Sequence, residues 1–133
     1  RGVARDVTAT RQTEQRVAYM AHHDGLTGLA NRFLFGETLA GQLARQRKGD
    51  SCALLYLDLD HFKIVNDTLG HSCGDLLLTE AARRITSKVK DHDLVARLGG
   101  DEFAVLLTRF RGEEEARAVA DAAESNVTVF MSN

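Results

Sequence analysis

Residues 96–107 read ARLGGDEFAVLL, and they place two glycines and two acidic residues between two short apolar stretches. Apolar runs on either side of a glycine turn are typical of a β-hairpin. Gly99 and Gly100 can adopt positive φ without strain, which favours a type I′ turn centred on these two residues. Glycine also lets backbone N–H groups approach a phosphate closely. The stretch is therefore interpreted either as an ordinary turn or as a hairpin whose tip, with Asp101 and Glu102, meets a ligand.

Helical and strand patterns alternate around this hairpin. CALLYLDLD (52–60) is an apolar run that ends in acids, which predicts a buried strand, and HFKIVNDTLG (61–70) predicts a short helix closed by Gly70. Apolar spacing predicts helices over 72–90 and 112–125, and a further strand over 126–132. This order predicts an α/β (α+β) sandwich in which helices cover a mixed sheet that contains the antiparallel hairpin.

The N-terminal part of the chain is less regular. Residues 1–23 are polar, which predicts an extended lead-in and then a helix with a thin apolar stripe that serves as a connector. Residues 24–50 predict a loop that leads into an amphipathic helix ending near Gly49. We therefore expect one domain over residues 24–133, with residues 1–23 as the end of an upstream module and its connector.

Composition limits the class of protein. A chain of 133 residues, 44% of them hydrophobic, can form one domain with a core. The formal net charge of −2 argues against a nucleic-acid-binding surface over the whole molecule, so no nucleic-acid partner is expected. Cys52 and Cys73 lack metal or redox spacing, which favours reduced thiols and a cytoplasmic location. The parent protein could still be anchored to a membrane through other segments.

Two aspartates end the predicted strand 52–60. Asp58 and Asp60 lie on the same side of it, because side chains alternate along a strand. Like charges so placed repel unless a cation lies between them, and Mg²⁺ takes one or two carboxylates together with phosphate oxygens. If the hairpin lies beside this strand, Asp58, Asp101 and Glu102 converge on one point and form a metal site. The alternative is a solvated strand end that caps the following helix.

Four polar residues lie between the two acidic segments. Lys63 and Asn66 share one face of the predicted helix 61–70, where Lys63 could screen phosphate charge. Asn66 and Asp75 form a donor and acceptor set that can read the edge of a guanine. Alternatively, Asn66 is an exposed polar residue and Asp75 belongs to a capping box that opens the next helix. His71, like the other histidines, shows no metal-ligand spacing.

Three stretches and the spacing between them resemble the GGDEF domain of bacterial diguanylate cyclases. They are DGLTGLANR (24–32), LDLDHFKIVNDTLGHSCGD (57–75) and ARLGGDEFAVLL (96–107). The resemblance covers residues 24 to about 125. It implies a nucleotidyl-cyclase-like fold that condenses two GTP molecules into cyclic di-GMP and releases two pyrophosphates. Residues 1–23 resemble the end of a PAS sensor domain and the connector that joins it to such a cyclase.

The resemblance also implies roles for single residues. Mg²⁺, or alternatively Mn²⁺, would be held by Asp58, the backbone carbonyl of Leu59 and Asp101. The catalytic set would be Asp101, Glu102 and Lys63, in which Asp101 is a candidate base for the attacking 3′-hydroxyl group and Lys63 neutralises triphosphate charge. The GTP-binding residues would be Asn66, His71, Asp75, Gly99 and Gly100. Because the product has two-fold symmetry, a homodimer with one GTP per domain is implied, and the paired connector helices would control it.

Two departures from the family pattern stand out. Lys90 and Asp93 occupy the place of the Arg-x-x-Asp inhibitory site, and lysine cannot reproduce the bidentate contact of arginine, although Arg97 lies near in sequence. Residues 126–133 lack the family's Ser-x-Gly signature, which indicates a domain truncated at its C-terminus. The alternative function is an inactive GGDEF module that binds GTP or cyclic di-GMP and regulates an attached phosphodiesterase or other output domain.

Overall fold

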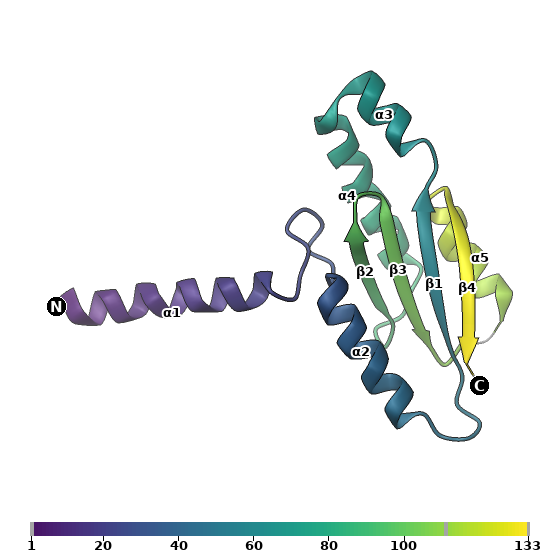
Figure 1. Ribbon diagram of the computed structural model, residues 1–133, viewed down its shortest axis with the longest axis horizontal. Coiled ribbons are helices and arrows are strands. Elements are labelled where there is room, and N and C mark those ends of the chain that lie inside the picture. Colours follow the sequence, from purple (N-terminus) through teal and green to yellow (C-terminus); the bar gives the residue numbers. More distant parts are fainter. Residues whose placement is uncertain (1, 111, 133) are drawn as a thin grey trace.

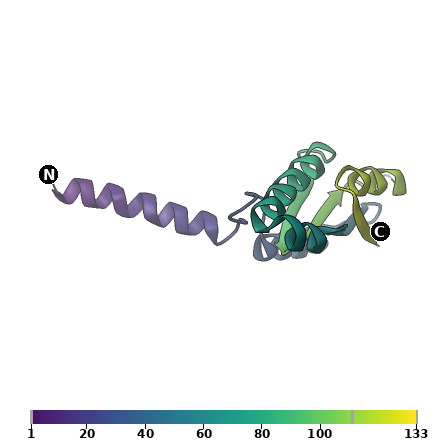
Figure 2. The ribbon, with the colours of Figure 1, turned by 90° about the horizontal axis from the view of Figure 1, so that it is seen from above.

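The computed structural model describes residues 2–110 and 112–132 of the chain. Its elements follow one another in the order α1 (Gly2–Met20), α2 (Arg32–Arg45), β1 (Cys52–Leu59), α3 (Phe62–Leu69), α4 (His71–Ser87), β2 (Leu94–Gly99), β3 (Glu102–Thr108), α5 (Glu113–Ala122) and β4 (Ser125–Ser132). Helix α1 projects away from the remainder, in which helices cover both faces of one sheet (Figures 1 and 2). The predicted α/β sandwich and its order of elements are confirmed.

The sheet has the strand order β2-β3-β1-β4, and each neighbouring pair is antiparallel. The sheet expected to be mixed is therefore antiparallel among the described strands. Strands β1 and β2 do run in the same direction, but β3 lies between them, so the connection through α3 and α4 forms a split β-α-β unit. This topology places the C-terminal end of β1 beside the turn that joins β2 and β3 (Figure 1).

Two apolar layers hold the helices against the sheet. The larger layer joins one face of the sheet to α4 and α5, and its buried residues include Leu55, Ile85 and Phe103. The smaller layer joins the other face to α2 and includes Phe35 and Leu106. Because side chains alternate along a strand, β1 contributes to both layers, which explains why it reads as a nearly continuous apolar run.

The N-terminal elements differ from the prediction in two places. The expected extended lead-in is wrong, because α1 is helical from Gly2 to Met20. Its sequence has no proline and several Ala, Arg and Gln residues, whose helix propensity outweighs that of the scattered valines and threonines. Helix α2 ends at Arg45 and so stops before Gly49. Among the described residues, no helix is both long enough and apolar enough to cross a membrane.

Candidate functional site

The residues predicted to bind metal and GTP lie at one end of the sheet. There β1 ends, the β2–β3 turn lies beside it, and the corner between α3 and α4 follows directly (Figure 1). Asp58 of β1 is the cross-strand partner of Glu102 of β3. The backbone N–H of Leu59 donates to the carbonyl of Asp101 at 3.3 Å. The structure thus places the two acidic segments, residues 58–60 and 101–102, side by side.

The hairpin turn is centred one residue later than predicted. Gly99 pairs with Glu102, so Gly100 and Asp101 form the tip. Both glycines have positive φ, 145° and 51°, whereas Asp101 does not. A type I′ turn needs positive φ at both central residues, so the predicted I′ turn centred on Gly99 and Gly100 is wrong. A Cβ atom at either glycine would meet no atom within 4 Å, so the space around the turn is open.

Asp58 lies among like charges. Burial, and then the carboxylates of Asp101, Glu102 and Asp60, raise the pKa of Asp58, and all of these influences act in the same direction. Hydrogen bonding to Glu102 raises the pKa of the Tyr56 phenol on the same strand. Like charges on directly paired strand residues destabilise a sheet. A cation at this point would therefore stabilise the folded chain.

The acidic residues fit a divalent cation that brings its own phosphate ligands. Among residues 2–110 and 112–132, no three His, Cys, Asp or Glu side chains are grouped closely enough to hold a metal ion, so the expected three-acid cluster is not preformed. Asp60 does not cap α3, whose N-cap is His61, and instead accepts a hydrogen bond from the Asn126 amide at 2.8 Å. Mg²⁺ needs only one or two protein carboxylates when phosphates supply further oxygens. Asp58, with its uncompensated charge, suits such a shared site.

The α3–α4 corner is built around Asn66. The Oδ1 atom of Asn66 is buried and has no hydrogen-bond partner among the described residues. It lies against Gly74 of α4, where a Cβ atom would stand only 1.8 Å away, so a larger residue at position 74 would displace the Asn66 side chain. With Oδ1 turned inward, the amide nitrogen is the group that remains available to a ligand.

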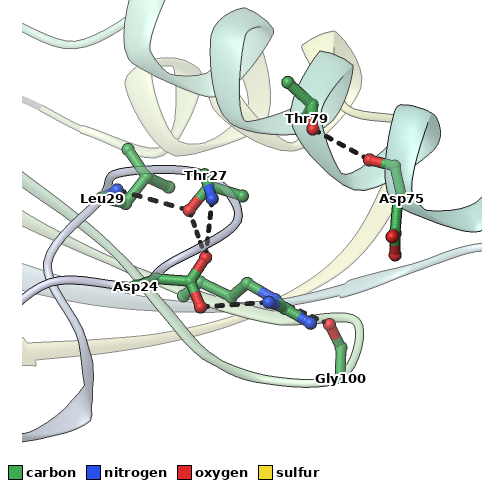
Figure 3. Close-up of polar contacts among 7 residues, drawn as sticks. Asp24, Thr27, Leu29, Asp75, Thr79 and Gly100 are labelled. Carbon is green, nitrogen blue, oxygen red and sulfur yellow. Dashed lines mark hydrogen bonds and ion pairs between the residues drawn. The ribbon is translucent and has the colours of Figure 1, made fainter. Parts of the chain in front are cut away.

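The other predicted nucleotide-binding side chains of this corner, Lys63, His71 and Asp75, are exposed. The capping box considered for Asp75 is absent, because α4 begins at His71 with Gly70 as N-cap and no side chain caps it. The backbone carbonyl of Asp75 accepts a hydrogen bond from the Thr79 hydroxyl at 2.9 Å, while the carboxylate extends away from the helix (Figure 3). Helix capping therefore does not account for this acid.

The DGLTG loop (residues 24–28) is connected to the hairpin through Asp24 and Arg97, which the sequence did not predict. Asp24 accepts hydrogen bonds from the backbone N–H and the hydroxyl of Thr27, at 2.8 and 2.7 Å. Its other oxygen forms an ion pair with Arg97 of β2 at 3.0 Å, and Arg97 Nε donates to the carbonyl of Gly100 at 3.0 Å (Figure 3). Burial works against ionisation of Asp24, but the bonds from Thr27 and Arg97 prevail and lower its pKa. An Asp followed three residues later by Thr signals a turn, but it gives no sign of a distant arginine.

Of the three residues considered for an inhibitory site, Lys90 and Asp93 are bonded to each other and Arg97 is bound elsewhere. Arg97 is bound to Asp24 and Gly100, at the hairpin. The side chain of Asp93 is only 3% exposed. It accepts hydrogen bonds from the backbone N–H groups of Lys90, at 2.9 Å, and Thr108, at 3.0 Å. Asp93 therefore fastens the turn before β2 to the end of β3.

One protein family matches most of the chain. The sequence model described as diguanylate cyclase, GGDEF domain, matches residues 21–132. The diguanylate cyclase TpbB of Pseudomonas aeruginosa PAO1 is 46% identical over 107 residues, which are 79% of this chain and 24% of TpbB. The cyclic di-GMP phosphodiesterase NbdA of the same strain is 51% identical over 88 residues, which are 65% of this chain and 11% of NbdA. The chain thus spans at most about a quarter of the length of these curated relatives.

The fold is also found among solved structures. The coiled coil and GGDEF domain of DgcB from Caulobacter crescentus, solved in complex with c-di-GMP, superposes with a TM-score of 0.78 and 29% identity. The match covers 98% of this chain and 77% of that chain, so it extends over most of α1 as well as the sheet and its helices.

Proposed function

The chain belongs to the diguanylate cyclase GGDEF domain family, and from this premise we propose that, in its full-length protein, it condenses two GTP molecules into cyclic di-GMP. In each half of the reaction, the 3′-hydroxyl oxygen of one GTP forms a bond to the α-phosphorus of the other, and pyrophosphate leaves. The observation that carries the proposal is the end of β1, where Asp58, with its raised pKa, lies beside an open glycine turn. The two-fold symmetry of the product favours a homodimer with one GTP in each domain.

Mg²⁺, or alternatively Mn²⁺, is the cofactor in this proposal. Asp58, the backbone carbonyl of Leu59 and Asp101 would hold the ion, with Glu102 beside them. When bound, such an ion neutralises phosphate charge and makes the α-phosphate more electrophilic. The repulsion among the carboxylates around Asp58 supports this assignment, because a cation between them would remove it.

The hairpin tip is proposed to act on the attacking hydroxyl group and the phosphates. Asp101 would accept the proton of the 3′-hydroxyl group as its oxygen attacks. Gly99 and Gly100 would let the backbone lie against the triphosphate, and the open space around both glycines supports this role. Lys63 would neutralise the charge that the triphosphate brings into the site.

The α3–α4 corner is proposed to select guanine. The amide nitrogen of Asn66 would donate to guanine O6 or N7, and Asp75 would accept from its N1–H and N2–H groups, with His71 close to the nucleotide. The inward orientation of Asn66 Oδ1 and the uncommitted Asp75 carboxylate support this assignment. Residues 1–23 would then be the end of an upstream sensor module and its connector. The free thiols of Cys52 and Cys73 support a cytoplasmic domain.

The test is synthesis of cyclic di-GMP by the full-length protein supplied with GTP and Mg²⁺, followed by chromatography. Asp101→Asn should lower turnover by about 100-fold or more, because a general base and a metal ligand are lost together. Calorimetry should still detect GTP binding by this variant. Glu37→Gln, a change on the surface of α2 away from the site, is the matched control and should leave turnover unchanged. A wild-type protein that binds GTP and Mg²⁺ but makes no product would contradict the proposal.

The second candidate function is an inactive module that binds GTP or cyclic di-GMP and regulates an attached phosphodiesterase or other output domain. Similarity to NbdA, a cyclic di-GMP phosphodiesterase, favours it. GTP that binds without turnover, and that changes the hydrolysis rate of an attached output domain, would select this function over the first.

We also expect product inhibition through the Lys90 turn to be weak or absent. Asp93 is already bound to two backbone N–H groups, and lysine lacks the planar fork that arginine offers to a guanine or a phosphate. Turnover should therefore change little when cyclic di-GMP is added at concentrations near that of the enzyme. A tight stoichiometric complex that is lost in Lys90→Ala would refute this expectation.

A further inference from the structure

The end of α1 is fastened to the domain by an aromatic pair. The Tyr19 ring stacks on the His23 ring, with centroids 3.9 Å apart and planes 8° from parallel. The Tyr19 hydroxyl donates to the backbone carbonyl of Gly28, at 3.4 Å. Gly28 has a φ of 75°, and a Cβ atom there would stand 4.0 Å from that hydroxyl oxygen. Gly28 adopts this left-handed conformation without strain, and because it has no side chain, the Tyr19 hydroxyl can approach the loop backbone.

From Gly28, hydrogen bonds continue to the hairpin tip. The backbone N–H of Gly28 donates to the carbonyl of Asp24 at 2.8 Å. The Asp24 carboxylate pairs with Arg97 at 3.0 Å, and Arg97 donates to the carbonyl of Gly100, which also lies 3.0 Å away. The side chains of Asp24 and Arg97 are each only 16% exposed, so their ion pair is largely shielded from solvent. The contacts therefore run without a gap from α1 to the residue before Asp101.

The end of α1 does not pack closely against the hairpin. A hollow of about 720 Å³ separates the two, and Met20, Phe33 and Gly99 are among the residues that line it. A movement of α1 can therefore reach the tip only weakly through direct contact. Two segments connect them: the DGLTG loop, and residues 30–31, where Asn31 N–H donates to the His22 carbonyl and Arg97 N–H donates to the Ala30 carbonyl. Of the two, the DGLTG loop holds the Arg97 side chain, which donates to Gly100.

We propose that Tyr19 is a positioning residue, which couples the orientation of α1 to the placement of the turn that carries Asp101. The proposal deepens the proposed function and rests on it for its catalytic consequence. A rotation of α1 that unstacks Tyr19 from His23 releases the Gly28 carbonyl and loosens the loop that holds Arg97. The Gly100 carbonyl then loses a fixed donor, and the position of Asp101 relative to Asp58 becomes less defined.

Amide hydrogen exchange in the full-length protein tests this coupling without any need for catalysis. In Tyr19→Ala, exchange at residues 27–29 and 99–102 should be about fivefold to tenfold faster, because a stacked aromatic pair and one hydrogen bond are lost. Tyr19→Phe keeps the ring that stacks on His23 but loses the hydroxyl that donates to Gly28, so its exchange rates should lie between those of the wild type and Tyr19→Ala. Val17→Ala, an exposed change on the same helix, should leave the hairpin unchanged. An increase confined to α1 and residues 27–29 would overturn the proposal.

Kinetics and a double-mutant cycle complete the test. Tyr19→Ala should lower kcat several-fold and change the KM for GTP less, because the proposed guanine contacts on α3 and α4 are untouched. In the double-mutant cycle with Arg97→Lys, the double mutant should exchange at the hairpin little faster than either single mutant, since both substitutions break the same chain of contacts. Additive effects would show that the two residues act separately and would overturn the proposal. A wild-type protein without cyclase activity would remove the proposed function, while hydrogen exchange would still decide the coupling.

Discussion

Two aspartates on opposite sides of the hairpin show opposite electrostatics. Asp24, in the DGLTG loop, is bound to Thr27 and Arg97, and its pKa is lowered. Asp58, at the end of β1, is surrounded by other carboxylates, and its pKa is raised. The first acid is satisfied within the chain, whereas the second carries charge that the chain leaves without compensation. Such a difference separates an acid that holds the fold together from one that is available to a metal and its phosphate ligands.

Among the substitutions that test this difference between Asp24 and Asp58, Asp58→Asn should have the largest effect on activity. Asp58→Asn removes a proposed metal ligand and should lower cyclic di-GMP synthesis by about 100-fold or more. The same change relieves repulsion between paired strand residues, so without Mg²⁺ the variant should be more stable by about 0.5 kcal/mol, or roughly 2 °C in melting temperature. Calorimetric unfolding with and without Mg²⁺ and GTP measures both effects. The ligands should raise the melting temperature of the wild type more than that of Asp58→Asn.

The pH dependence of this stability gap gives an independent check. Because the pKa of Asp58 is raised by folding, ionising it costs the folded state free energy. The gap between Asp58→Asn and the wild type should therefore be absent at low pH, where Asp58 is protonated. It should open as the pH rises from the ordinary aspartate pKa through the higher pKa of the folded state. A gap that closes over the same range would contradict the electrostatic assignment.

A smaller effect, on stability alone, is expected at Asp24. Asp24→Asn removes a shielded ion pair with Arg97 and weakens the Thr27 turn, so the folded state should lose about 2 kcal/mol, or roughly 7 °C in melting temperature. The lowered pKa of Asp24 means that this contribution is present above the ordinary aspartate pKa. It is lost as the pH falls through the lower pKa of the folded state. Asp67→Asn, at an exposed position of α3, is the matched control. Equal melting temperatures for both variants at pH 7 would argue against a structural role for Asp24.

The smallest effect is expected at Glu80, which sharpens the comparison. Hydrogen bonds from Arg83 and Arg84 lower the pKa of Glu80 to about 2, but its side chain lies on the exposed surface of α4. Exposed ion pairs contribute little to stability, so Glu80→Gln should leave the melting temperature almost unchanged. If Glu80→Gln lowered the melting temperature as much as Asp24→Asn does, ion pairing would stabilise the fold equally at exposed and at buried positions, and burial would not explain the effect at Asp24.

Much of the fold could be read from local patterns. The apolar run of β1 predicted a buried strand, the three- and four-residue spacing predicted α4, and Gly70 marked the end of α3, because each signal acts over a few neighbouring residues. The predictions that failed concerned segments for which two backbone conformations differ little in free energy. Helix propensity prevailed over an extended start in α1, and a register shift after Arg97 moved the centre of the turn to Gly100 and Asp101.

By itself, the sequence determined which residue types stand at the strand ends, the hairpin and the α3–α4 corner, since spacing and periodicity are properties of the chain. Only the tertiary structure decided which of these groups are satisfied. Arg97 reaches Asp24 across 73 positions of sequence, and Asn66 turns its oxygen onto Gly74 of the next helix. Asp58 meets Glu102 because β3 is inserted between β1 and β2. The physical reason is that hydrogen bonding and charge compensation depend on distances of a few ångströms, and folding sets these distances between residues far apart in the chain.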